Sequence, residues 1–192
     1  GSRKLDELTM SYDGLRRHGV NVVHDTVTAV DAEKRQVRLA AGGTLPFDRA
    51  VVSPGIECMY EQIQGMNPAA TETIPHAWKA GPQTLLLRSQ LEAMADGGVV
   101  VMSVPLAPYR CPPGPYERAC MIASYLKTAK PRSKLLVLDA NPEIQSKKAL
   151  FEKAFKDHYS GILEYRPNAE LKEVAGNVAK LKIAWRFALG NY

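Results

Sequence analysis

Several features that define large classes of proteins are missing from this 192-residue sequence. No apolar run approaches the ~18 residues that a membrane-spanning helix needs, which excludes a transmembrane segment. Three cysteines are too few for a disulfide scaffold, and the net charge of +5 forms no basic stripe of the kind that binds nucleic acid. No metal site is predicted, because the histidines show no ligand spacing with the cysteines. These histidines are His18, His24, His76 and His158.

What is present is typical of a folded globular protein. Hydrophobic residues make up 45% of the sequence and charged residues 23%, so the chain can bury a core and a disordered chain is excluded. The length suffices for one domain or for two small ones. Neither internal repeats nor low-complexity tracts occur.

The first part of the sequence carries too few elements for a complete domain. Helical spacing of apolar residues and strand-like alternation both occur, but they soon end in a proline-glycine turn. This pattern indicates the closing part of a domain. The predicted elements are a helix over residues 3–18, strands over 20–30, 36–39 and 47–52, and a turn at 53–55.

The second part alternates strands with helices. Prolines and glycines crowd residues 57–82, which predicts an irregular connection. Behind it, continuous apolar strands favour a parallel sheet with right-handed crossovers, covered on both faces. The predicted elements are helices over residues 84–94, 116–127 and 146–159 (with Ser146 as the N-cap), strands over 99–104, 134–139 and 162–165, and a hairpin of 171–174 and 178–183.

The loop after the first of these parallel strands is unsuited to a dinucleotide. In Rossmann-type units this loop is rich in glycine, so that the pyrophosphate approaches backbone N–H groups at a helix N-terminus. Here residues 103–117 carry five prolines and one glycine, and each proline removes an N–H donor. NAD binding is therefore disfavoured. Asp139, which ends the second strand, is either a ribose-binding acid or a plain strand-end aspartate.

Cys111 in that loop is the main candidate for chemistry. It lies between Arg110 and Pro112, just before a helix, and a cation and a helix N-terminus both favour the thiolate. Glu117 in the first turn of the helix either acts as an acid/base near the sulfur or simply complements the helix dipole. An inert structural thiol is the alternative interpretation of Cys111.

The other candidates carry weaker signals. Cys120 is expected to be a small buried hydrophobe, and a pairing of Cys58 with Cys111 stays open. Trp78 shares a proline-bounded loop with His76. The indole either anchors that loop on the core or faces a flavin or a substrate.

The decapeptide Arg-Cys-Pro-Pro-Gly-Pro-Tyr-Glu-Arg-Ala at residues 110–119 closely resembles a family signature. The family is the flavoprotein subunit of flavocytochrome c sulfide dehydrogenase, a relative of sulfide:quinone oxidoreductase. Further segments resemble it in the same order and at similar spacing, over about residues 10–165. They are residues 12–16, 18–19, 23–25, 47–49, 52–55, 75–81, 97–100 and 130–134, of which 75–81 favours the flavocytochrome branch.

The resemblance implies an α/β fold with Rossmann-like domains of the disulfide-reductase type. One such domain binds FAD, and the other is NAD(P)-like without using NAD. On this basis residues 1–62 are the C-terminal part of the FAD-binding domain, 63–82 a connection and 83–192 the NAD(P)-like domain.

The resemblance also implies an activity. In that family sulfide attacks a redox disulfide beside the flavin, and the electrons leave to a c-type cytochrome subunit in the periplasm, although no export signal stands in this sequence. Cys111 matches the first disulfide cysteine, and Glu117 matches the glutamate near it. The residues implied to bind FAD are Thr26, Val27, Ser53, Pro54, Gly55 and Trp78.

Departures from the family pattern predict an internal fragment that is inactive on its own. A glycine-rich FAD phosphate loop is not found, and neither Cys58 nor Cys120 stands at the position of the second redox cysteine. Residues 184–192 resemble nothing in the family. Three functions are held open: a sulfide-oxidising flavoenzyme of the cytochrome or quinone type, a non-catalytic docking domain, and an NAD(P)-dependent reductase.

Overall fold

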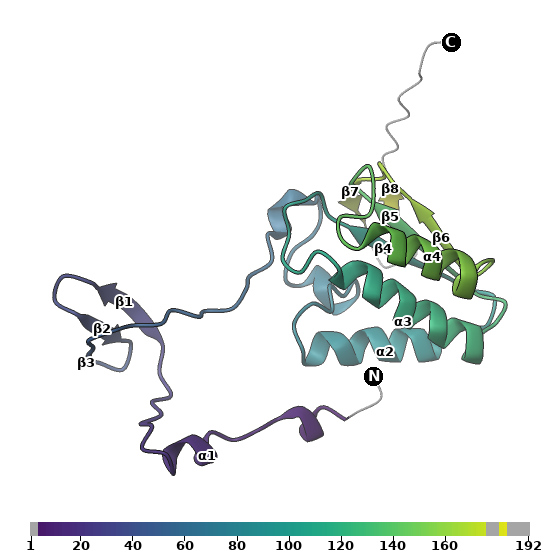
Figure 1. Ribbon diagram of the computed structural model, residues 1–192. Helices are drawn as coiled ribbons and strands as arrows, with labels where there is room; N and C mark the ends of the chain where they lie inside the picture. The colour runs from purple at the N-terminus through teal and green to yellow at the C-terminus, as the bar shows by residue number, and fades with distance from the viewer. Residues whose placement is uncertain (1–3, 176–180, 184–192) are drawn as a thin grey trace, which may run out of the picture. The chain divides into compact units, whose positions relative to one another are not determined.

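A parallel sheet forms the centre of the second half of the chain in the computed structural model, which describes residues 4–175 and 181–183 (Figure 1). Its strands lie in the order β4-β5-β6, and both pairs are parallel. Helices α3 and α4 connect the strands and pack against each other. The predicted α/β fold with a Rossmann-like parallel sheet is confirmed. The bounds are β4 Val99–Val104, α3 Gly114–Ala129, β5 Lys134–Asp139, α4 Lys148–Tyr159 and β6 Leu163–Arg166.

The hydrophobic core lies between this sheet and helix α3. The buried residues of α3 recur every three or four positions, which gives the helix one apolar stripe. The stripe packs with Leu135 and Val137 of β5, both fully buried, and with Phe151 and Phe155 of α4. The residues of the stripe are Tyr116, Ala119, Ile122, Ala123 and Leu126.

Helix α2 (Pro82–Ala93) precedes the sheet and confirms the helix predicted over residues 84–94. Proline at the first helical position loses no hydrogen bond, because the N–H groups of the first turn have no partner within the helix. At the other end, the Lys130 ammonium donates to the backbone oxygen of Glu92 at 2.9 Å. That bond satisfies one of the carbonyl groups that a helix C-terminus leaves open.

The predicted C-terminal hairpin is present as strands β7 (Leu171–Val174) and β8 (Leu181–Ile183), which pair antiparallel. Residues 176–180, which connect the two strands in the sequence, lie outside the described part of the chain. The connection before α2 contacts this hairpin, since Gln64 N–H donates to the oxygen of Lys172 at 3.0 Å. A Cβ on Gly65 would lie 2.1 Å from the Val174 oxygen, and φ there is +79°, so only glycine fits.

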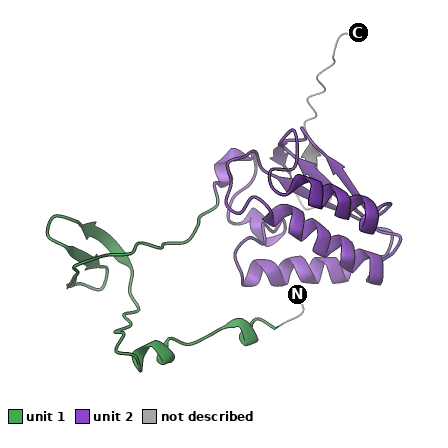
Figure 2. Ribbon diagram, viewed as in Figure 1, with its two compact units in different colours: residues 1–58 green, residues 59–192 purple. Residues whose placement is uncertain are grey.

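The chain divides into two units, residues 1–58 and 59–192 (Figure 2). The connection in the second unit contains two short 3-10 turns, η2 (Tyr60–Gln62) and η3 (Ala70–Glu72). The first unit holds an antiparallel meander of β1 (Val27–Asp31), β2 (Gln36–Leu39) and β3 (Thr44–Pro46). The predicted strand over 36–39 is confirmed, and the strand predicted over 20–30 is formed only from Val27 onward.

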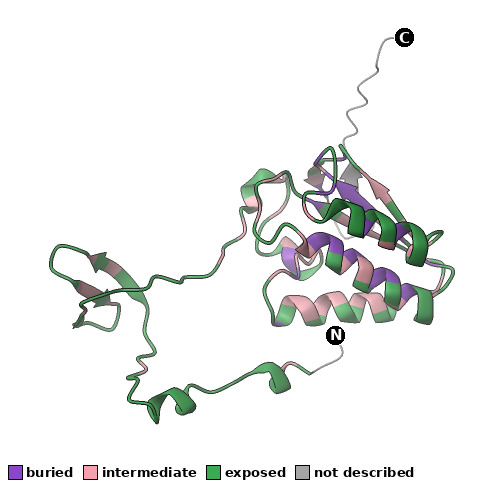
Figure 3. Cartoon of the chain, viewed as in Figure 1, coloured by how far each residue is buried: buried purple, intermediate pink, exposed green. Residues whose placement is uncertain are grey.

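Two predictions for the first unit are wrong. The helix expected over residues 3–18 is reduced to the 3-10 turn η1 (Asp6–Leu8) and the single turn α1 (Asp13–Arg16). The buried strand expected over 47–52 does not form, and Val51 is 95% exposed. A short helix or strand with one apolar face is stable only when that face packs against a partner surface. None of the described residues of this unit is buried, so such a surface is not present here (Figure 3).

The start of helix α4 also differs from the prediction. Ser146 does not cap it, because the helix begins at Lys148 after Lys147, whose φ is +51°. Just before this point the Gln145 N–H donates to the Tyr116 hydroxyl at 3.1 Å. A tertiary hydrogen bond therefore directs the chain where local capping was expected. Residues 184–192, which resembled nothing in the family, lie outside the described residues.

A search of the described residues finds no helix that is long and apolar enough to cross a membrane.

Candidate functional site

Cys111 lies in the loop that follows strand β4 and precedes helix α3. It is an exposed, free thiol, and its backbone has a φ of +61°. A left-handed backbone is unfavourable for a residue with a Cβ and persists only where the surroundings hold it. Here the Cys111 oxygen accepts the N–H of Gly114 at 2.9 Å, which ties the cysteine to the first residue of the helix.

Gly114 brings Cys111 and Trp78 to one place. A Cβ built on this glycine would lie 3.0 Å from Cη2 of Trp78 and 3.3 Å from Sγ of Cys111. The sulfur and the edge of the indole therefore border the same small space, which the missing side chain leaves free. Residues 33 positions apart in the sequence, on two different loops, meet at this helix start.

The loop that carries Trp78 is held firmly. Ala77 is buried with a φ of +48°, and its N–H donates to the side chain of Gln83 at 3.4 Å. The amide of that same Gln83 donates to the Thr71 oxygen at 2.9 Å, so one side chain of helix α2 holds the segment before Trp78 at two points. Trp78 is half-buried. The edge of its ring borders the same space as the Cys111 sulfur.

Arg118 adds a positive charge to this group. Its guanidinium carbon lies 5.9 Å from the centre of the Trp78 ring, and its Nη1 donates to the His76 oxygen at 3.4 Å. Burial lowers the pKa of the Arg118 guanidinium. Within residues 4–175, no carboxylate pairs with Arg118. The positive charge beside the Trp78 ring is therefore not neutralised by a carboxylate of these residues.

Asp139 cannot serve as a ribose-binding acid in this structure. It is fully buried at the end of β5, and its carboxylate accepts four hydrogen bonds. Oδ2 accepts the hydroxyls of Tyr116 at 2.7 Å and Tyr165 at 2.9 Å. Oδ1 accepts the backbone N–H of Asn141 at 2.9 Å and its Nδ2 at 2.7 Å. Four bonds use the full acceptor capacity of a carboxylate.

Among the described residues, no polar contact with Cys111 is found for the candidate residues Glu117 and Cys120. Glu117 is exposed in the first turn of α3, and no hydrogen bond joins its carboxylate to Cys111 in the described part of the chain. Cys120 is partly buried against the core; burial raises its pKa, and the charge of Glu117 raises it further. Cys58 is a free, half-buried thiol.

The predicted FAD-binding residues of the first unit are exposed. Thr26 and Val27 lie where strand β1 begins. Gly55 has a φ of +84° with nothing within 4 Å of the Cβ position, so the turn needs glycine for its backbone and leaves open space beside it. The N–H groups of Ser53 and Gly55 carry no hydrogen bond to another described residue.

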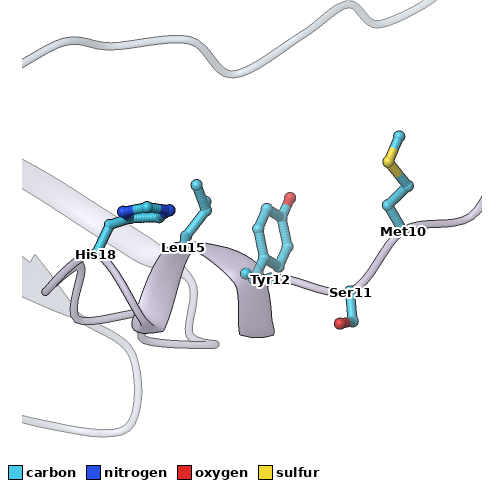
Figure 4. Close-up of a pocket in the computed structure, with 6 residues that line it drawn as sticks. Met10, Ser11, Tyr12, Leu15 and His18 are labelled. Carbon is cyan, nitrogen blue, oxygen red and sulfur yellow. The ribbon is translucent and has the colours of Figure 1, made fainter.

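A hollow in the surface of the first unit does not coincide with any of these residues. It is a shallow depression beside the single turn α1, and its apolar residues Met10 and Tyr12 are 85% and 56% exposed (Figure 4). None of the predicted site residues lines it. The residues around it are Met10, Ser11, Tyr12, Gly14, Leu15 and His18.

His76 should make stability depend on pH. Its Nδ1 accepts the N–H of Trp78 at 3.0 Å, a bond that protonation breaks. Burial lowers the pKa of His76, and the charges of Lys79 and Arg118 lower it further. The unfolded chain therefore takes up this proton first as pH falls, so the stability present above about pH 6.5 is lost toward the lowered pKa.

Urea unfolding at about pH 7.5 and about pH 5 measures this effect. We expect His76→Gln to lose less stability on acidification than the parent chain. His158→Gln, at an exposed position of α4, is the matched control and should behave as the parent. Equal losses in the His76→Gln variant and the parent would show that His76 contributes nothing.

Sequence reasoning missed part of this site. Arg118 and His76 were not assigned roles beside Cys111, although both fall inside the segments that resemble the family. The tyrosines around Asp139 were treated only as helix and strand residues. A tyrosine on the buried stripe of a helix is a usable signal, because its hydroxyl needs a buried partner.

Residues 84–189 match the family profile described as the central part of the flavoprotein chain of sulfide dehydrogenase [flavocytochrome c], more than half of the chain. The chain belongs to this family. Its match begins in α2 and includes the Cys111 loop, Asp139 and the hairpin. The family was the one expected from residues 110–119, so that expectation is confirmed.

Solved structures support the α/β fold of the chain. A ferredoxin reductase from Rhodopseudomonas palustris aligns over 90% of the chain with a TM-score of 0.58 and 14% identity. The sulfide:quinone oxidoreductase of Aquifex aeolicus aligns over 84% with a TM-score of 0.54 and 17% identity. The chain spans 39% and 38% of the lengths of these two proteins.

Proposed function

We propose that this chain is part of an FAD-dependent sulfide dehydrogenase in which Cys111 is the thiol that carries the sulfur atom. The observation that supports this most is the exposed thiol of Cys111, held at the start of α3 beside Trp78 within the segment that matches the family. A nucleophilic cysteine requires exposure and a fixed direction, and this loop provides both.

The unneutralised charge of Arg118 suits an anionic sulfur substrate. Hydrosulfide and polysulfides are anions at neutral pH, and a positive potential raises their local concentration at the thiol. The positive charges of Lys79 and Arg118 both act on His76 and lower its pKa, so two cations lie near this loop. Glu117 is proposed as the proton carrier, on the strength of its place in the first turn of the same helix.

The proposed sulfur step leaves atoms and electrons balanced. Hydrosulfide attacks the Cys111 sulfur of a disulfide between Cys111 and a second cysteine of the whole protein. One S–S bond forms and one breaks, so that Cys111 becomes a persulfide and the second sulfur leaves as a thiolate. With a polysulfide, the Cys111 thiolate attacks a sulfane sulfur instead and releases a chain shorter by one atom.

FAD is the proposed cofactor, and the first unit offers groups that fit part of it. The open turn at Ser53, Pro54 and Gly55 exposes backbone N–H groups suited to ribityl, ribose or phosphate oxygens. Thr26 and Val27, at the start of strand β1, offer exposed side chains beside a backbone that is already hydrogen-bonded. In the second unit, Trp78 is proposed to face the flavin. When bound, the flavin supplies a two-electron acceptor for the thiolate.

The partner and the location follow from the family alone. We propose a c-type cytochrome subunit as the electron acceptor and the periplasm as the compartment, where a disulfide-dependent reaction is chemically supported. The domain assignment of residues 1–62, 63–82 and 83–192 is part of the same proposal. A quinone acceptor is the alternative within the oxidoreductase class.

Mass spectrometry of the intact chain after incubation with polysulfide tests the sulfur-carrying role. We expect a mass gain of one sulfur atom that dithiothreitol reverses, located on the peptide containing Cys111. A gain confined to Cys58 or Cys120 would contradict the assignment, and so would no gain under conditions where a free cysteine peptide reacts.

A docking role is the second candidate, and exposed apolar side chains of the first unit favour it. Val51 is 95% exposed and Val52 is 69% exposed. Neighbouring apolar side chains that are left uncovered mark a surface that gains from burial against a partner.

A further inference from the structure

We propose that Asp139 is a positioning residue for the Cys111 thiol and acts through Tyr116 and Tyr109. The proposal deepens the proposed function, on which it rests, by naming what holds the sulfur in place. The edge of the sheet where this fold usually contacts a nucleotide is filled here by the protein's own side chains. Their hydrogen bonds lead from the end of β5 to the cysteine loop.

The first part of the argument is the state of the Asp139 carboxylate. It is fully buried and has no cation partner in the described residues, yet all four acceptor positions are filled. Such a group is costly to bury and is rigid once satisfied, because any displacement leaves a donor unpaired. It is therefore a fixed point from which neighbouring groups take their positions.

The second part is the route from this fixed point to the loop. The Tyr116 hydroxyl donates to Asp139, and it accepts the Gln145 N–H at 3.1 Å and the Tyr109 hydroxyl at 3.3 Å. The Tyr109 hydroxyl also lies 3.4 Å from the oxygen of Pro112, the residue after Cys111. Tyr109 and Pro112 thus flank the cysteine, and the single proton of the Tyr109 hydroxyl is shared between the Tyr116 hydroxyl and the Pro112 oxygen.

A second arm of the network holds the beginning of the same loop. Asn141, which donates twice to Asp139, accepts the Ala107 N–H on Oδ1 at 2.9 Å. Its Nδ2 donates to the Pro105 oxygen at 2.9 Å. The loop before Cys111 is therefore fixed at its start by Asn141 and at its end by Tyr109, and both depend on one carboxylate.

The position of the Cys111 sulfur depends on this hydrogen-bonded loop. Burial raises the pKa of Tyr109, the hydrogen bond with Tyr116 lowers it, and electrostatic interactions with Asp139 and with Cys111 raise it. Cys111 also carries a left-handed φ of +61°, which a loose loop would relax. Relaxation would move Sγ away from Gly114 and from the Trp78 indole.

The test uses the fluorescence of Trp78 in the whole chain. Trp185→Phe leaves Trp78 as the single tryptophan, and a thiol next to an indole quenches its emission. The difference in emission between this parent and its Cys111→Ser derivative reports the contact. We expect Tyr109→Phe to reduce that difference by about half or more, because one hydrogen bond that closes the loop is lost.

Tyr125→Phe is the matched control. Tyr125 lies on α3, packs against the core, and its hydroxyl has no hydrogen bond to another described residue. It should leave the difference unchanged. Tyr109 is tested in place of Asp139 because its hydroxyl is at the outer end of the network, so the variant stays folded, which urea unfolding checks.

An unchanged difference in Tyr109→Phe would overturn the proposal, as would a parent whose emission does not depend on Cys111. No sulfur compound enters this measurement, so its result is separate from persulfide formation at Cys111. Failure of that reaction would reject the proposed function while leaving the positioning intact.

Discussion

Replacing Cys111 with serine is expected to slow strongly the uptake of sulfur from polysulfide by this chain. The serine hydroxyl stays protonated near neutral pH and does not attack a sulfane sulfur. The two remaining thiols are half-buried, and burial raises the pKa of Cys120. We expect the rate of persulfide formation to fall at least about tenfold, to the level of these thiols. Intact-mass measurements over a time course give the rate.

The matched controls are Cys120→Ser and Cys58→Ser, which remove one thiol each from less exposed positions. Both should retain most of the parent rate. If either control loses as much as Cys111→Ser, the sulfur is carried elsewhere. Circular dichroism and urea unfolding of all three variants would separate a chemical effect from a loss of fold.

The second large effect is expected for Asp139→Ala. The substitution leaves four buried donors without their acceptor, from Tyr116, Tyr165 and Asn141. An unsatisfied buried polar group costs about 1–3 kcal/mol, and part of that is recovered where water enters the space that the carboxylate vacates. We expect a loss of about 4 kcal/mol in the free energy of unfolding, a large share of the ~5–15 kcal/mol of a typical domain.

Urea unfolding followed by circular dichroism measures this loss. Asp157→Ala, which removes an exposed carboxylate paired with Lys153 on α4, is the control and should barely shift the midpoint. A similarly small shift for Asp139→Ala would show that its hydrogen bonds are replaced by water at no net cost. The buried network would then have no stabilising role.

The second unit could be predicted from sequence because its signals are local. The apolar run at residues 134–139 became strand β5 with the predicted bounds, and the helix predicted over 116–127 lies within α3. Strands buried on both faces are apolar throughout, and strand-helix alternation permits few topologies. These patterns do not depend on knowing which residues meet.

The first unit shows where such patterns fail. Leu8, Tyr12 and Leu15 have helical spacing, yet they are 56%, 56% and 46% exposed, and the helix is not formed across them. The periodicity of apolar residues identifies which face of a helix would be buried if the helix formed. A short helix is stable only when that side finds a surface.

The sequence by itself determined the fold class and the family, because both depend on residues that are neighbours along the chain. It also predicts Cys111 as the cysteine for the proposed chemistry. Only the tertiary structure decided what surrounds Cys111. Trp78 reaches the sulfur from another loop across Gly114, and Asp139 is hydrogen-bonded through the Tyr116 hydroxyl to Tyr109 of the cysteine loop. Contacts between distant segments depend on how the elements pack, and packing distances are not encoded in any single stretch of sequence.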